Sequence, residues 1–308
     1  MANLIDSIDQ RTKLVGENRL ELLTFRLKGS QLFAMNVFKI QEVLQLPKLN
    51  SLPQSNPVVS GVTTVRGNTI SVIDLSQAIG RSPIVQDEKA NIIVTEYNRS
   101  IQAFLIGGVD RIVNLNWKDV LPPPKATGRG HFLTAITQID EKIVEIIDVE
   151  RVLSDVISFN SKISDNVLDQ ALFEKAQGLD VLLVDDSPVA IGQVKNALLQ
   201  LGLNVIVETD GLKGLRRLQR LEAEGYDFAS KMLLVITDAE MPEMDGYSLT
   251  TEIRKDPLLK DLYVILHTSL SDSFNEAMVK KVGCDDFLSK FQPDLLATTV
   301  QDRLRLRL

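Results

Sequence analysis

The feature that most constrains this chain is a set of polar residues placed directly after short apolar segments in its second half. In chain order, these segments are followed by Asp185 and Asp186, by Asp238, by Thr268 and by Lys290. Longer segments with helical spacing of apolar residues separate them, a pattern typical of strand and helix units around a parallel sheet. Because the carboxyl ends of parallel strands open on one crevice, we expect these side chains to meet there.

The order of these residues carries more weight than any one of them. The expected strands are residues 179–184, 232–237, 262–267 and 286–289. Pro188 suits the first turn of the helix after the first strand, because its fixed φ is helical and its missing N–H needs no partner there. Taken singly, a pair of aspartates after a strand is usually a helix cap, and a lysine is usually a surface residue. Their joint order favours one shared site.

Three aspartates in one crevice favour a bound cation. Carboxylates about 4 Å apart repel by about 4 kcal/mol per pair at an effective dielectric constant near 20. Mg²⁺ suits such a site, since it takes oxygen ligands, keeps several waters and bridges to phosphate oxygens. Asp238 could then attack a phosphorus atom while the metal and Lys290 neutralise charge on the transferred group. Thr268 would hydrogen-bond a phosphoryl oxygen.

Four stretches of the second half, VDDSP, TDAEMPEMDGYSL, HTS and GCDDFLSK, resemble the receiver domain of response regulators. The resemblance covers about residues 179–308 and implies a doubly wound, flavodoxin-like sheet. It implies that Asp238 accepts a phosphoryl group from a phosphohistidine on a partner kinase. Mg²⁺ would be bound directly by Asp186, Asp238 and the backbone carbonyl of Glu240, while Asp185 holds a metal-bound water.

The same resemblance gives Thr268 and Lys290 the switch and phosphate-contact roles, and two departures from the family pattern stand beside it. The switch aromatic is Phe287, which keeps an apolar ring but has no hydroxyl. The proline that usually follows the lysine directly is displaced to Pro293. Glu240 adds a carboxylate at the expected mouth of the pocket.

The first half has a different texture, with short alternating apolar runs separated by Gly, Pro, Asn and Ser, which predicts an all-β fold. It also echoes itself. Residues 33–37 and 40–43 align with residues 102–106 and 109–112, and residues 70–75 align with residues 144–149. Two similar small β-barrels would explain the echo, and chance agreement between short strands is the alternative.

Four segments of this half, FAMNVFKIQEV, GVTTVRGNTISVIDL, GGVDRI and IVEIIDVERVL, resemble the CheW coupling family. The resemblance implies two SH3-like barrels that link chemoreceptors to the histidine kinase CheA. Arg66 matches the arginine of the family's RG turn and is the candidate receptor contact, although a solvated hairpin arginine would look the same. Val37, Ile40 and Val62 could line an apolar binding groove, and core packing explains them equally well.

Composition limits the other possibilities. At 308 residues the chain has room for about two domains. A formal net charge of −7 without a dense basic block opposes nucleic-acid binding. The start lacks a secretory signal, no apolar run is long enough to insert into a membrane, and the lone Cys284 fits a reducing compartment. We expect a segment over residues 1–16 that could be helical, a β domain over 17–158, a helical linker over 159–178 and a receiver over 179–308.

The order of the two modules resembles the CheV family of chemotaxis proteins. The resemblance implies an adaptor that couples methyl-accepting chemotaxis receptors to CheA, with phosphorylation of Asp238 modulating the coupling. The alternative is a phosphate sink that drains the kinase, with the CheW-like half serving only for localisation. A phosphatase is disfavoured, because such enzymes generally carry a D-x-D pattern whereas Asp185 and Asp186 are adjacent. We expect a cytoplasmic protein at receptor arrays rather than a dedicated enzyme.

Overall fold

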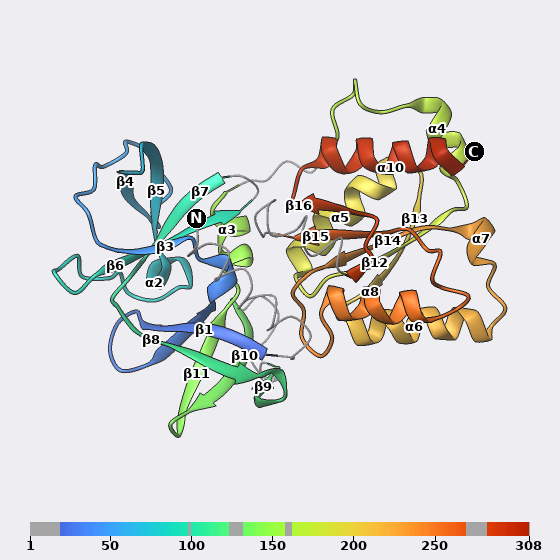
Figure 1. Cartoon of the computed structure of the whole chain (residues 1–308). Coiled ribbons are helices and arrows are strands. Elements are labelled where there is room, and N and C mark those ends of the chain that lie inside the picture. Colours follow the sequence, from blue (N-terminus) through green and yellow to red (C-terminus); the bar gives the residue numbers. More distant parts are fainter. Residues whose placement is uncertain (1–18, 98–99, 123–131, 158–161, 269–281, 308) are drawn as a thin grey trace, which may run out of the picture. The chain divides into compact units, whose positions relative to one another are not determined.

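A computed structural model describes residues 19–97, 100–122, 132–157, 162–268 and 282–307. Contacts divide the chain into two compact units, with the boundary between residues 159 and 160. The N-terminal unit is built of β-strands with short helices, and the C-terminal unit alternates strands and helices (Figure 1). Both halves of the expected fold class are therefore confirmed. The helix expected within residues 1–16 lies outside the described residues.

The N-terminal unit is formed by strands joined mostly by short turns. These strands are β1 (Arg19–Arg26), β2 (Leu32–Asn36), β3 (Glu42–Gln45), β4 (Val59–Val65), β5 (Asn68–Asp74), β6 (Asn91–Tyr97), β7 (Ser100–Ile106), β8 (Gly108–Asn116), β9 (Val120–Leu121), β10 (Leu133–Ile139) and β11 (Lys142–Ile147). The helical segments are η1 (Val37–Lys39), α2 (Leu75–Ala78), η2 (Trp117–Asp119) and α3 (Val149–Val156).

The echo in the sequence corresponds to a duplicated strand pattern. One sheet has the order β8-β1-β2-β11-β10-β9 and the other has the order β3-β6-β7-β5-β4. Matching β1, β2, β3, β4 and β5 to β6, β7, β8, β10 and β11 converts one order into the other, apart from the added β9. Each sheet mixes strands of both copies, because β2 pairs in parallel with β11, and β5 pairs in parallel with β7. The two copies have exchanged strands and do not form one sheet each.

Strand β2 shows why one core serves both sheets. Its residues alternate between two faces. Phe33 and Met35 pack in a cluster that also contains strands of the other sheet, whereas Leu32 and Ala34 pack in a smaller cluster on the opposite face. The larger cluster joins the two sheets into a single folded unit.

A half-buried carboxylate gives this unit a predicted pH dependence. Asp148 caps α3 by accepting a hydrogen bond from the Arg151 N–H at 2.9 Å. Burial and the neighbouring Glu150 raise the pKa of Asp148, with Lys39 opposing them. The folded state therefore favours the protonated carboxyl of Asp148. The free energy of unfolding falls as pH rises from the unfolded-state pKa of this group through its higher folded-state pKa.

We therefore expect Asp148→Asn, which keeps an oxygen acceptor for the cap, to be more stable than wild type at pH 7. The advantage should shrink toward pH 4, because the wild-type side chain becomes protonated there. Chemical denaturation at both pH values measures the difference. An advantage that is equal at the two pH values would contradict the assignment.

The C-terminal unit begins with a short helix, α4 (Gln170–Ala176), before the alternating part. Its strands are β12 (Asp180–Val184), β13 (Asn204–Glu208), β14 (Met232–Asp238), β15 (Val264–Thr268) and β16 (Asp286–Ser289). Its longer helices are α5 (Pro188–Gln200), α6 (Gly211–Ala223), α8 (Gly246–Lys255) and α10 (Pro293–Arg307), with the short α7 (Phe228–Lys231) before β14. Among the residues that the structure describes, every helix is too short or too polar to span a bilayer.

These strands form one parallel sheet with the order β13-β12-β14-β15-β16. Apolar residues of α4, α5 and α10 pack on one face, and those of α6 and α8 pack on the other (Figure 1). Strand β14 is buried along its whole length at the centre of the sheet. The order places the carboxyl ends of β12, β14 and β15 side by side.

The segment expected to be a helical linker differs from that expectation. Within residues 162–178, helix is confined to Gln170–Ala176. Ile163, Leu172 and Ala176 belong to the core between the sheet and α5 and α10. The apolar spacing that suggested one long helix instead reflects several separate contacts with the C-terminal unit.

Candidate metal centre

Three carboxylates converge at the carboxyl edge of the parallel sheet. Asp185 and Asp186 follow β12, and Asp238 ends β14, the neighbouring strand. Each offers one ligand oxygen, and the three oxygens lie within 4.8 Å of one another. Asp185 and Asp238 are buried and Asp186 is half-buried. The expected convergence of the three aspartates is therefore present.

Lys290 joins this cluster from the end of β16, the strand at one edge of the sheet. Its Nζ lies 2.9 Å from Asp185 Oδ2 and 2.8 Å from Asp238 Oδ2. The lysine is only 4% exposed, so its ammonium must be paired to remain charged there. The three carboxylates and the one ammonium together carry a formal charge of −2. That surplus and the all-oxygen donor set fit one hard divalent cation.

Local structure fixes the direction of Asp185. Its Oδ1 accepts a hydrogen bond from the Ser187 N–H at 2.8 Å, which turns its Oδ2 toward Lys290. Ser187 in turn caps α5 by accepting from the Ala190 N–H, and Pro188 opens the helix as expected. The VDDSP stretch therefore orients the Asp185 carboxylate and also starts α5.

A close backbone contact holds the turn after Asp238. The Gly246 N–H donates to the Ala239 carbonyl at 3.1 Å, and the Thr237 hydroxyl donates to the Asp238 carbonyl at 3.0 Å. A Cβ atom added at Gly246 would lie 2.0 Å from the Asp238 carbonyl oxygen. Only glycine fits there. Gly246 lies in the TDAEMPEMDGYSL stretch, but its role could not be predicted from the sequence, because the contact depends on how the turn folds back.

The remaining expected pocket residues lie on β15, after β14 and on β16. Thr268 is buried at the end of β15, and its carbonyl accepts the Lys290 N–H at 2.9 Å. Glu240 is half-buried two residues after Asp238. Phe287, on β16, is half-buried against the core on the α6 and α8 side.

Tyr247 is a second neighbour that the sequence reasoning missed. It is buried on α8, where desolvation and the nearby carboxylates of Glu240 and Asp238 raise its pKa. Tyr247 therefore stays neutral over the physiological range. The lone Cys284 is also buried, which raises the pKa of its thiol to about 11 and makes it unreactive.

The candidate surface residues of the N-terminal unit differ in how far the structure exposes them. Arg66 sits in the turn between β4 and β5 with a positive φ of 49°, and its side chain is 78% exposed while paired with Glu42 at 3.0 Å. Val37 and Ile40 pack partly against the large core. Val62 is half-buried on β4. Core packing thus accounts for part of the apolar surface at Val37 and Ile40, whereas the Arg66 guanidinium is accessible.

Comparison with known families agrees with both units. Residues 21–156 match the CheW-like domain family, and residues 181–301 match the response regulator receiver domain family. The chain is thus a CheW-like domain joined to a receiver domain.

Two curated relatives align over nearly the whole chain. Chemotaxis protein CheV3 of Helicobacter pylori is 32% identical and covers 90% of this chain and 92% of its own length. CheV1 of the same organism is 30% identical and covers 99% of this chain and 100% of its own length. The chain belongs to the CheV family of chemotaxis proteins. It is a chemotaxis coupling adaptor with a receiver domain, and the phosphate-sink alternative is not favoured.

Two solved structures are similar to the separate domains. The scaffolding protein TtCheW of Thermoanaerobacter tengcongensis is 22% identical, covers 42% of this chain and 83% of its own, and has a TM-score of 0.38. The receiver domain of the sensor histidine kinase PA1611 of Pseudomonas aeruginosa, solved with magnesium in its active-site cleft, is 26% identical. It covers 42% of this chain and 98% of its own, with a TM-score of 0.36.

Proposed function

We propose that this adaptor couples methyl-accepting chemotaxis receptors to the histidine kinase CheA, and that phosphorylation of Asp238 modulates the coupling. The observation that carries the proposal is the cluster of three carboxylates joined by the buried Lys290 at the end of the sheet. The membership in the CheV family and the presence of a CheW-like domain support the two partners.

The geometry supports a specific division of labour in the pocket. A carboxylate oxygen of Asp238 would attack the phosphorus of a phosphohistidine, the P–N bond would break, and the imidazole would leave with the bonding electrons. Lys290, already 2.8 Å from Asp238, would pair with a phosphoryl oxygen, and Thr268 would donate its hydroxyl to another.

Mg²⁺ would be held by Asp186, Asp238 and the Glu240 carbonyl, with Asp185 binding through a water. When bound, the ion supplies charge neutralisation for the transferred group. In the first domain, Arg66 would contact the receptor, and Val37, Ile40 and Val62 would contribute apolar surface to the same binding region. Their accessible portions are what a partner would meet, since the rest packs in the domain. The whole chain would act in the cytoplasm at receptor arrays, as a phosphate acceptor rather than as a dedicated enzyme.

A reconstituted array tests the proposed regulation. Receptors, CheA and the adaptor are combined, and kinase activity is measured as the adaptor becomes phosphorylated. We expect kinase activity to change with wild type and to stay constant with Asp238→Asn. If phosphoryl groups reach wild-type Asp238 but kinase activity follows the same course with both adaptors, the receiver only drains the kinase and the regulatory proposal is wrong.

Glu240 provides a prediction about the lifetime of the modification. Its half-buried carboxylate follows Asp238 by two residues, so it can influence a water that attacks the aspartyl phosphate. We expect Glu240→Ala to change the dephosphorylation rate by about 3-fold or more, within the range of a positioned carboxylate acting on water. Glu243→Ala, a change in the same loop, is the control. Equal rates for wild type and Glu240→Ala would remove Glu240 from the mechanism.

A further inference from the structure

Residues 162–169, called the strap here, lie against α5 and α10 of the receiver. Ile163 is fully buried, and its N–H donates to the side-chain oxygen of Gln200, the last residue of α5, at 3.2 Å. Ser164 is held twice by Asp294. Its N–H donates to one carboxylate oxygen at 2.8 Å, and its hydroxyl donates to the other at 2.7 Å. The first end of the strap is therefore fastened to the first turn of α10.

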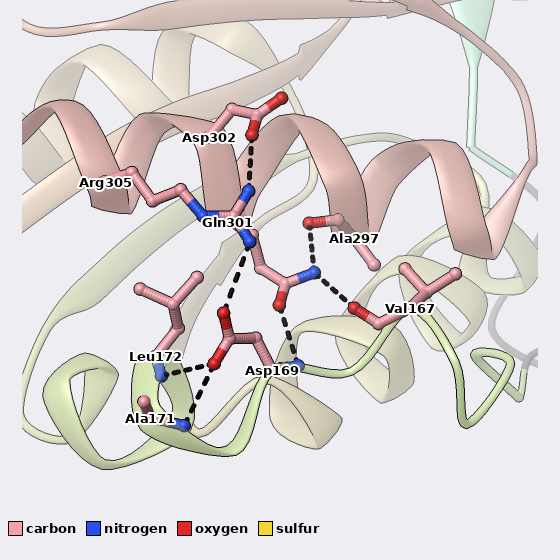
Figure 2. Close-up of polar contacts among 8 residues, drawn as sticks. All are labelled: Val167, Asp169, Ala171, Leu172, Ala297, Gln301, Asp302 and Arg305. Atoms are coloured by element: carbon pink, nitrogen blue, oxygen red, sulfur yellow. Dashed lines mark hydrogen bonds and ion pairs between the residues drawn. The ribbon is translucent and has the colours of Figure 1, made fainter.

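The second end of the strap is held by a buried amide (Figure 2). Gln301, on α10, is 2% exposed. Its side-chain oxygen accepts the Asp169 N–H at 3.0 Å, and its amide nitrogen donates to the Val167 carbonyl at 2.9 Å. Arg305 also pairs with Asp169 at 3.3 Å. Without the strap, the buried side chain of Gln301 would lose its hydrogen bonds to the backbone of Val167 and Asp169. The strap is therefore an integral part of the receiver fold.

The two ends differ in how easily they can open. The bonds between Ser164 and Asp294 are exposed, so water can replace them at little cost. The bonds of Gln301 to the strap are partly buried, and the Asp169 side chain beside them also caps α4. A pocket of about 140 Å³ bordered by Leu168, Asp169 and Gln301 lies at this second end. The contact between Ser164 and Asp294 can open while the buried Ile163 and the Gln301 end stay in place.

The partner of Ser164, Asp294, lies closer along the chain to the acidic pocket than Gln301 does. Asp294 follows Lys290 by four residues, and Lys290 is paired directly with Asp185 and Asp238. A phosphoryl group on Asp238 adds a dianion and gives the ammonium of Lys290 a new partner. Phe291, Gln292 and Pro293 join Lys290 to Asp294, so a displacement of Lys290 can reach Asp294 through a short connection.

We propose that the contact between Ser164 and Asp294 is a two-state latch that responds to occupancy of the Asp238 pocket, while Gln301 keeps the strap in place. This inference rests on the proposed function, since it takes Asp238 as the phosphorylated residue. Because the strap follows the CheW-like domain in the chain, a change at its first end is a local route by which the receiver acts on the segment that joins the two domains.

Amide hydrogen exchange on the full chain tests the latch. The probe is beryllofluoride with Mg²⁺, a stable analogue of the phosphoryl group, and Asp238→Asn is the control. We expect occupancy to change the exchange rate of the Ser164 amide by about 5-fold or more and that of the Asp169 amide by less than about 2-fold. Unchanged Ser164 exchange with the analogue demonstrably bound, or equal changes at both amides, would overturn the latch. Failure of the analogue to bind wild type would instead overturn the proposed function, and the latch with it.

A matched pair of variants tests the latch in the reverse direction. Coupling between two sites is reciprocal, so Ser164→Ala should change the affinity for beryllofluoride by about 2-fold or more. The affinity should rise if occupancy loosens the latch and fall if occupancy tightens it. Thr298→Ala is the control, because that hydroxyl donates only to the Asp294 carbonyl within the same helix. Calorimetric affinities that are equal for wild type, Ser164→Ala and Thr298→Ala would contradict the proposal.

Discussion

Replacing Gly246 with alanine is expected to destabilise the receiver by about 3 kcal/mol, at the upper end of what overpacking usually costs. The added Cβ would lie 2.0 Å from the Asp238 carbonyl oxygen and 3.0 Å from the Thr237 hydroxyl oxygen. Both neighbours are part of the buried end of β14 and cannot move without displacing Asp238. We therefore expect loss of Mg²⁺ affinity together with the loss of stability. Chemical denaturation and metal titration measure the two effects.

Gly192→Ala is the matched control, since an added Cβ there meets no atom within 4 Å in the described part of the chain other than its chain neighbours and the adjacent backbone of its own helix. It lies within α5, where alanine is more favourable than glycine by about 0.8–1 kcal/mol. This variant should therefore be slightly more stable than wild type and bind Mg²⁺ equally well. Equal stability of the Gly246→Ala and Gly192→Ala proteins would show that the turn after Asp238 is not as tight as described.

Replacing Lys290 with methionine should separate metal binding from phosphoryl transfer. The ammonium lies 2.9 Å from Asp185 Oδ2 and 2.8 Å from Asp238 Oδ2, where the transferred group would arrive. Removing a preorganised charge that contacts a transferring group typically costs about 10²–10³ in rate. We expect transfer from phosphorylated CheA to slow by about 100-fold.

Mg²⁺ affinity should be kept or increased in the same variant, because the three carboxylates remain and no longer pair with an ammonium. Lys255→Met, which removes an exposed lysine paired with Glu252 on α8, is the control and should leave both properties unchanged. A Lys290→Met protein that accepts phosphoryl groups at the wild-type rate would remove Lys290 from the transfer step. If the Lys290→Met protein also lost Mg²⁺ binding, the proposal that Lys290 acts on the phosphoryl group alone would be wrong.

Local sequence patterns predicted the alternating fold of the receiver and the meeting of its acidic residues. Each apolar strand is short, and the polar residue after it must emerge at one edge of a parallel sheet. Strand β16 was expected at residues 286–289 and is found there, and β12 begins one residue later than expected. The site was predictable because its position depends only on strand order and strand ends.

Contacts between distant segments could not be predicted in the same way. The repeat in the first half suggested two similar barrels, but periodicity carries no information on whether β2 pairs with its own copy or with β11. The polar strap suggested a linker because its partners, Asp294 and Gln301, lie more than a hundred residues away. The role of Gly246 could not be predicted either, since it depends on how the chain folds back onto the Asp238 carbonyl.

The most direct test of the account is the transfer of labelled phosphate from phosphorylated CheA to the full chain in the presence of Mg²⁺. We predict that wild type becomes labelled, that Asp238→Ala does not, and that chelation of the metal slows transfer to wild type. Labelling of Asp238→Ala at the wild-type level, or equal rates with and without Mg²⁺, would contradict the central claim that Asp238 is a magnesium-assisted phosphoacceptor.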